Sequence, residues 1–100
     1  MEKKDFKENT RCTLTAKIDG KLRPTNVYIL KLFKENMIVR LTDKEGILRK
    51  MAYDDVSKIV ASHDVSEQNH YSAPEAVLLE KHWQDRVEMQ HYGTASHMGK

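Results

Sequence analysis

The chain has 100 residues, of which 39% are hydrophobic and 32% are charged. This length and balance predict one globular domain and exclude a fibrous or largely disordered chain. The net charge is +2, but residues 1–60 carry 14 basic against 9 acidic side chains, +5, and residues 61–100 carry 3 against 6, −3. A basic half of this kind attracts phosphates, although a solvated surface of mixed charge explains the same balance.

No segment resembles a targeting or membrane signal. Residues 1–10 are mostly charged, and no apolar run approaches the roughly 20 residues that cross a bilayer. We therefore expect a cytoplasmic protein with no membrane partner and no cofactor. Cys12 is the only cysteine and falls at an inward strand position, which favours a buried structural thiol.

The first elements are an arm and a strand. Residues 1–10 are polar except for Phe6, so we expect a loose arm or a short turn held against the domain by Phe6. Residues 11–18 alternate between apolar and polar side chains, which predicts a half-buried strand. Asp19 and Gly20 accept positive φ and predict a tight turn after it.

The centre of the chain predicts a long hairpin. Residues 26–34 and 37–42 are rich in β-prone side chains, and only the polar pair Glu35-Asn36 separates them. The first of these segments is apolar on both faces, so it either curls inside a barrel or packs against another part of the chain. Pro24 suits the start or the edge of this strand because it lacks an amide donor.

Two further strands are expected at residues 47–53 and 57–61. A turn at residues 43–46 precedes the first strand, and a single helical turn at residues 54–56 joins the two. Residues 11–62 then hold five short antiparallel strands, which predicts a mainly β fold and a small closed barrel.

A linker and a helix are expected after the barrel. Residues 63–71 are polar, and Ser72 and Pro74 suit the cap and first turn of a helix. Apolar side chains then recur at helical spacing, which predicts an amphipathic α-helix over residues 72–93. Its apolar face is expected to hold Ala76, Leu79, Trp83 and Val87. Residues 94–100 should form a disordered tail.

The order of these features resembles the Sm-like family, most closely its bacterial Hfq branch. Residues 18–22, Ile-Asp-Gly-Lys-Leu, resemble the first motif of the family, in which a turn joins two strands. Residues 51–60 resemble the second motif, in which Tyr53 and two polar residues lead into the last strand. The resemblance implies a small, strongly bent, five-stranded antiparallel barrel of the Sm-like (SH3-like) kind.

The resemblance also implies a function. Members of the family form homo-oligomeric rings by pairing the fourth strand of one subunit with the fifth of the next, and they bind single-stranded, often uridine-rich RNA. Carried over by position, the RNA-binding loops are residues 33–37 and 53–55. The candidate RNA-binding residues are Asn36, Tyr53, Phe33, Lys34 and Lys31, since rings stack on bases, amides read base edges and cations hold phosphates.

These residues also have structural explanations. Tyr53 at a strand end suits packing at the barrel rim, and the turn residue Asn36 needs no ligand. In the bacterial branch of the family the tyrosine is followed by Lys-His, whereas this chain has Asp54-Asp55, and two carboxylates beside a pore repel phosphate. A phosphate-binding surface and a solvated face are equally compatible with Lys31, Lys34, Arg40, Arg49 and Lys50.

Three classes of function remain open. The first is an Sm-like ring that binds single-stranded RNA without catalysis, and the second is a structural or protein-interaction ring that has lost pore RNA binding. The third is an enzyme or small-ligand binder on an SH3-like barrel, but the sequence offers no nucleophile with a base and no phosphate loop. For that reason we expect no enzyme. We also expect no metal site, because the five histidines match no metal-ligand spacing.

Overall fold

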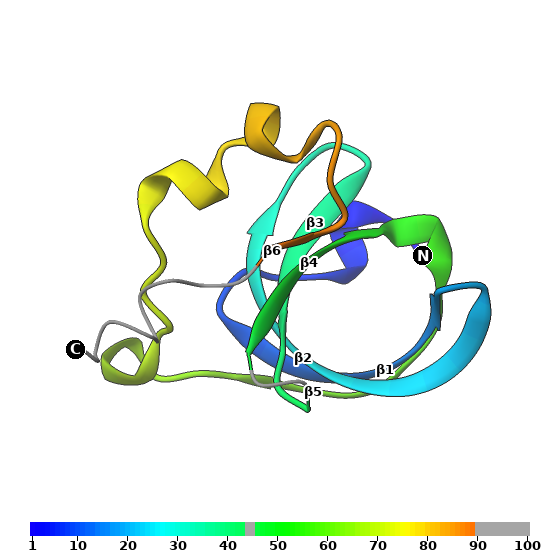
Figure 1. Cartoon of the computed structure of the whole chain (residues 1–100). Helices are drawn as coiled ribbons and strands as arrows, with labels where there is room; N and C mark the ends of the chain where they lie inside the picture. The colour runs from blue at the N-terminus through cyan, green and yellow to red at the C-terminus, as the bar shows by residue number, and fades with distance from the viewer. Residues whose placement is uncertain (44–45, 90–100) are drawn as a thin grey trace.

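The computed structural model describes residues 1–43 and 46–89, in which the strands form one curled antiparallel sheet (Figure 1). The order of the six strands described is β5-β1-β2-β3-β4-β6. Their bounds are β1 (Thr10–Ile18), β2 (Lys21–Leu32), β3 (Asn36–Leu41), β4 (Ile47–Ala52), β5 (Val56–Asp64) and β6 (Glu88–Met89). Short 3-10 turns complete the described chain: η1 (Lys3–Asp5), η2 (Tyr53–Asp55), η3 (Glu67–Asn69), η4 (Glu75–Leu78) and η5 (Glu80–Trp83).

The mainly β, antiparallel character of the fold is confirmed, but the closed five-stranded barrel is wrong. Over the described residues the sheet is open and has six strands, with β5 at one end and β6 at the other. The extra strand is only two residues long, and it pairs Met89 with Leu48 and Glu88 with Arg49 along the outer edge of β4. So short a strand has no alternating pattern, and its partner decides that it forms.

The local turn chemistry is as expected. Asp19 and Gly20 both have positive φ, 52° and 85°, and they join β1 to β2. The single turn η2 links β4 to β5. Pro24 pairs with Thr15 near the start of β2. These features depend on neighbouring residues alone, which is why the sequence predicts them.

Apolar clusters lie on both faces of the sheet, and the outer one covers β2, β3 and β4. The cluster inside the curl is built from alternate residues of the strands and is closed by Phe6, whose ring stacks on Tyr53 with 5.6 Å between centroids. It includes Leu14, Ile18, Val27, Ile29, Val39, Leu41 and the buried Cys12. The outer face carries a second cluster of Tyr28, Leu30, Phe33, Ile38, Leu48 and Trp83. The prediction that β2 is apolar on both faces is therefore confirmed, and the C-terminal part of the chain provides the outer cover.

The expected α-helix over residues 72–93 is wrong in its described part. Residues 72–89, which we call the strap, form the turns η4 and η5 and then β6, while residues 90–93 and the expected tail at 94–100 lie outside the described residues. Leu79 separates the two turns because its backbone is extended, with φ −93° and ψ 127°. Leu79 and Val87 of the expected apolar face are exposed, whereas Trp83 is fully buried. Contact with the sheet has therefore overridden a helical pattern that is marginal on its own.

Candidate nucleic-acid interface

The two loops that the resemblance assigns to RNA binding lie side by side at one rim of the sheet. Asn36 of β3 pairs with Ala52 of β4, and the Tyr53 amide donates to the Glu35 carbonyl at 3.3 Å. The hairpin turn is closed by the Phe33 amide, which donates to the Asn36 carbonyl at 2.8 Å. We call the surface formed by residues 33–37 and 53–55 the rim. The pairing of β3 with β4 therefore brings together residues that are 20 positions apart.

Tyr53 packs at the rim and has little exposed ring. It is 4% exposed, its ring stacks on Phe6, and its hydroxyl donates to the Phe33 carbonyl. Burial raises the pKa of Tyr53; the Glu8 carboxylate raises it further, and the hydrogen bond to Phe33 lowers it. The packing explanation for Tyr53 thus agrees with its position, and stacking on a base would require the ring to move.

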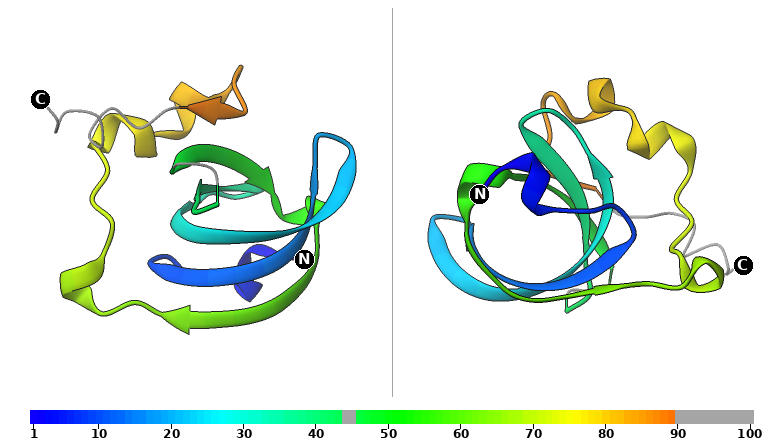
Figure 2. Two further views of the ribbon diagram at one scale, coloured as in Figure 1. Left: turned by 60° about the horizontal axis from the view of Figure 1, so that its bottom comes forward. Right: turned by 180° about the vertical axis from the view of Figure 1, so that it is seen from behind.

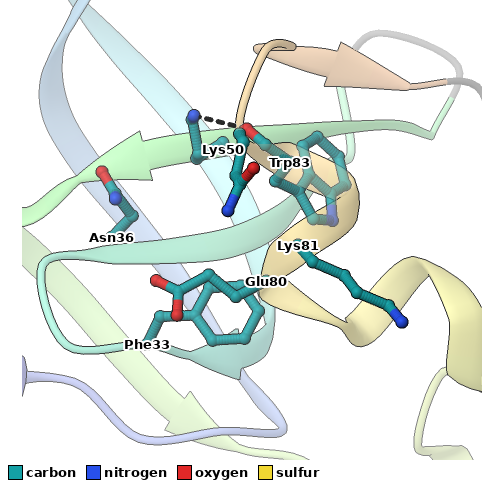
Figure 3. A pocket seen from close by; sticks show the side chains of 7 residues that line it. Phe33, Asn36, Lys50, Glu80, Lys81 and Trp83 are labelled. Carbon is teal, nitrogen blue, oxygen red and sulfur yellow. Dashed lines mark hydrogen bonds between the residues drawn. The ribbon is translucent and has the colours of Figure 1, made fainter.

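Phe33 and Asn36 line a cavity between the rim and the strap. The cavity measures about 340 Å³, and its other lining residues are Lys50, Glu80, Lys81, Trp83 and Gln84 (Figure 3). Phe33 is buried in the outer cluster, while Asn36 is half-buried. The Asn36 side chain is thus partly exposed to solvent, and it lies beside a cavity that is lined by both positively and negatively charged side chains.

The two candidate lysines of the hairpin are accessible. Lys34 is exposed, and it lines a second cavity of about 290 Å³ together with Tyr53 and Asp54. Lys31 is half-buried, and its Nζ lies 4.0 Å from the Glu8 carboxylate. The five candidate residues are consequently not one cluster, because Phe33 and Asn36 line one cavity and Lys34 and Tyr53 line another.

The rim itself is of mixed charge. Glu35 and Asp54 are exposed beside Lys34, and Asp55 is half-buried. Each carboxylate repels a phosphate and so weakens the attraction between the phosphate and Lys34. This repulsion becomes smaller as the salt concentration rises. Lys34 is thus an exposed cation of the rim with two exposed carboxylates beside it, and Lys31 lies on β2 outside the rim.

The other three candidate cations hold the C-terminal segment on the sheet. Arg40 lies over the ring of Tyr71, 4.5 Å from its centroid. Burial raises the pKa of Tyr71, and the Arg40 cation opposes that shift. Lys50 donates from Nζ to the Trp83 carbonyl at 2.6 Å.

Arg49 is the most buried of these cations. It is only 8% exposed, and it pairs with Glu88 of β6 at 2.7 Å and with Asp19 at 3.5 Å. The sequence offered one indirect signal that another segment packs on the sheet, because β2 is apolar on both faces. It offered none for the pairing of Arg49 with Glu88, because the two residues are 39 positions apart.

Comparisons with protein families, with curated proteins and with solved structures find no match for this chain. Within residues 1–43 and 46–89, no three histidine, cysteine, aspartate or glutamate side chains gather as a metal site would require. The described chain also contains no helix with the length and apolar character to span a bilayer.

Proposed function

We propose that this protein is a non-catalytic, Sm-like module that binds single-stranded RNA at the rim. One observation carries the proposal: the two loops that the resemblance assigns to RNA lie hydrogen-bonded to each other. The motif resemblance in residues 18–22 and 51–60, together with the one-turn link η2, supports it.

The roles differ among the candidate residues. Lys34 and Lys31 hold phosphates, because they are accessible cations at the end of the β2–β3 hairpin that carries the turn. The half-buried Asn36 amide reads the edge of a base placed at the mouth of the cavity. Tyr53 and Phe33 are packed side chains, so they position the loop backbone and offer no free face for stacking.

The test is binding of a fluorescent oligouridine of about eight nucleotides, measured by anisotropy over a series of salt concentrations. The double variant Lys31→Ala/Lys34→Ala should weaken binding and lower the slope of log K against log salt by about 0.7 for each phosphate that is no longer neutralised. Arg11→Ala/Lys58→Ala is the matched control, because it removes the same charge from exposed positions on β1 and β5. If the control weakens binding as much as the rim variant, the proposed site is wrong.

Asn36 is tested separately. Asn36→Ala should reduce the preference for oligouridine over oligoadenosine with little change in salt slope, because an amide reads bases and carries no charge. An unchanged preference would remove Asn36 from the site.

A ring of identical subunits is part of the proposal, through the family resemblance. β5 is at one end of the sheet, but the outer edge of β4 is covered by the strap from Leu48 to Lys50, where the Lys50 amide donates to the Val87 carbonyl at 2.8 Å. Pairing of β4 with a neighbouring β5 therefore requires β6 to leave. Native mass spectrometry should give a closed multiple of the 11.7 kDa chain, and a monomer at all concentrations would refute the ring.

The second candidate is an Sm-like structural or protein-interaction ring without RNA binding. The carboxylates of Glu35, Asp54 and Asp55 at the rim favour it, together with the burial of both candidate aromatic side chains. A native oligomer that binds no oligouridine even at low salt would support this candidate over the first.

A further inference from the structure

The two ends of the sheet differ in what covers them. Among the described residues, no strand lies beside the outer edge of β5, whereas β6 lies along the outer edge of β4. In the left view of Figure 2, β5 is the lowest strand of the sheet and the orange arrow of β6 lies near the top. An uncovered strand edge presents backbone donors and acceptors with which another strand can pair. The sheet therefore has one open edge and one closed edge.

The closed edge is covered at its middle. β4 is six residues long, and β6 pairs with Leu48 and Arg49 at its centre. The amide of the next residue, Lys50, donates to the Val87 carbonyl at 2.8 Å. Backbone groups that point to one side of a strand serve one neighbour at a time. A strand from another molecule can therefore pair along β4 only after β6 has left it.

β6 is held at this edge by an anchor outside the edge. A strand of two residues is too short to keep its place by backbone pairing alone. Trp83 precedes it in the strap and is fully buried in the outer cluster, where its Nε1 donates to the Val77 carbonyl at 2.6 Å. The Trp83 carbonyl in turn accepts from Lys50 Nζ at 2.6 Å. This anchor keeps β6 beside β4 at a high effective concentration, so β6 competes with any free strand as a tethered one.

The rest of the sheet does not need β6. The inner cluster contains no strap residue, and the pairing among β1, β2, β3, β4 and β5 involves none. Tyr71, just before the strap, has its own attachment, since its amide donates to the Tyr28 hydroxyl at 3.0 Å and Arg40 lies over its ring. β6 can therefore leave the edge of β4 while the core and the five long strands keep their contacts.

We propose that the strap is an autoinhibitory element that blocks assembly of this chain through the β4 edge. The strand that β6 excludes is the uncovered β5 of a second copy, so this inference rests on the ring of the proposed function and gives that ring a regulator. It makes no use of the RNA contacts. The apparent affinity between subunits falls by the fraction of chains whose β4 edge is open. The strap thus sets the protein concentration at which the ring forms.

The experiment compares one protein with its strap locked and released. Cys12→Ala/Arg49→Cys/Glu88→Cys places two thiols at paired positions of β4 and β6, a separation that a disulfide can span. The disulfide is formed at low protein concentration, and a denaturing gel without reductant checks that the product is an internally linked monomer. Light scattering over a dilution series then gives the concentration at which half of the chains are assembled.

The locked and released forms should differ in assembly. The oxidised protein should stay monomeric, because β6 cannot leave β4. The reduced protein lacks the ion pair between Arg49 and Glu88, so it should reach half-assembly at about one tenth of the wild-type concentration or less. Trp83→Ala should shift assembly in the same direction without a change at the edge, and circular dichroism checks that each variant is folded.

The matched control is Cys12→Ala/Arg11→Cys/His63→Cys, whose disulfide links paired positions of β1 and β5 and leaves β6 free. It should assemble equally in its oxidised and reduced forms. If the strap-locked protein assembles as readily as its reduced form, autoinhibition is wrong and the ring stands. If the wild type and every variant stay monomeric at all concentrations, the ring itself is refuted, and its regulation with it.

Discussion

Replacing Trp83 by alanine tests whether the strap is a stabilising part of the fold. The side chain is fully buried, and a buried tryptophan removes roughly 200 Å² from water, equivalent to about 5 kcal/mol at 25 cal/mol per Å². Tryptophan-to-alanine changes in cores cost about 3–5 kcal/mol. The inner cluster does not include Trp83, so the loss is limited to the free energy with which the strap docks. We therefore expect Trp83→Ala to lower the free energy of unfolding by about 3 kcal/mol, the lower end of that range.

Urea unfolding followed by far-ultraviolet circular dichroism gives the change in stability, since the variant removes the only tryptophan. Hydrogen exchange locates the change. The Lys50 amide, which donates to the Val87 carbonyl, should exchange about 100-fold faster, because each 1.4 kcal/mol corresponds to a factor of ten.

The control is Trp83→Phe, which keeps an aromatic ring in the cluster and removes the hydrogen bond to Val77, at a cost of about 1–2 kcal/mol. Two results would refute the reasoning. One is a loss below about 1 kcal/mol for Trp83→Ala with unchanged exchange at Lys50. The other is equal destabilisation by both variants.

The remaining predictions concern Tyr53 and two glycines. Tyr53→Phe should cost about 1 kcal/mol at neutral pH, because the hydroxyl no longer donates to Phe33. The folded-state pKa of Tyr53 is raised by burial, so its neutral form stabilises the protein fully below about pH 10 and that contribution is lost as pH rises through the folded pKa. Urea midpoints from pH 8 to 11 should therefore fall more steeply for wild type than for Tyr53→Phe, and parallel curves would contradict this. Gly20→Ala should cost about 1 kcal/mol, because φ is +85° but the added Cβ meets nothing within 4 Å. Gly46→Ala should cost about 2 kcal/mol, since its Cβ would lie 2.5 Å from Arg40 Nη2 and would displace that cation. Equal losses for the two glycines, measured by urea unfolding, would show that Arg40 moves aside freely.

The strands could be predicted because their signals are local. Alternation in residues 11–18 corresponds to β1 at Thr10–Ile18, and the segment 47–53 corresponds to β4 at Ile47–Ala52. The last strand is longer than expected, since β5 runs from Val56 to Asp64, into the predicted linker. Side chains there are mostly exposed, so the apolar pattern that defines a strand in sequence is weak at its end.

The candidate site could be predicted only in part. The position of the loops followed from the resemblance, and β3–β4 pairing does bring them together. The burial and the contact partners of each side chain did not follow from the resemblance. The Tyr53 ring stacks on Phe6 and its hydroxyl donates to the Phe33 carbonyl. Arg49 and Lys50 donate hydrogen bonds to the strap. Burial and partner choice depend on contacts between distant parts of the chain, and no spacing rule contains them.

By itself, the sequence determined the antiparallel strands, their turns and the apolar character of both faces of β2, because period-two alternation and turn residues act over a few positions. It left open whether the second apolar face of β2 curls inside a barrel or packs against another part of the chain. The tertiary structure alone decided that this face is covered by a strap without an α-helix, anchored by Trp83 and joined to the β4 edge. The physical reason is competition between two uses of the same residues. A solitary helix of this length is marginal in water, whereas burying Trp83 and pairing β6 with β4 stabilise the extended path more.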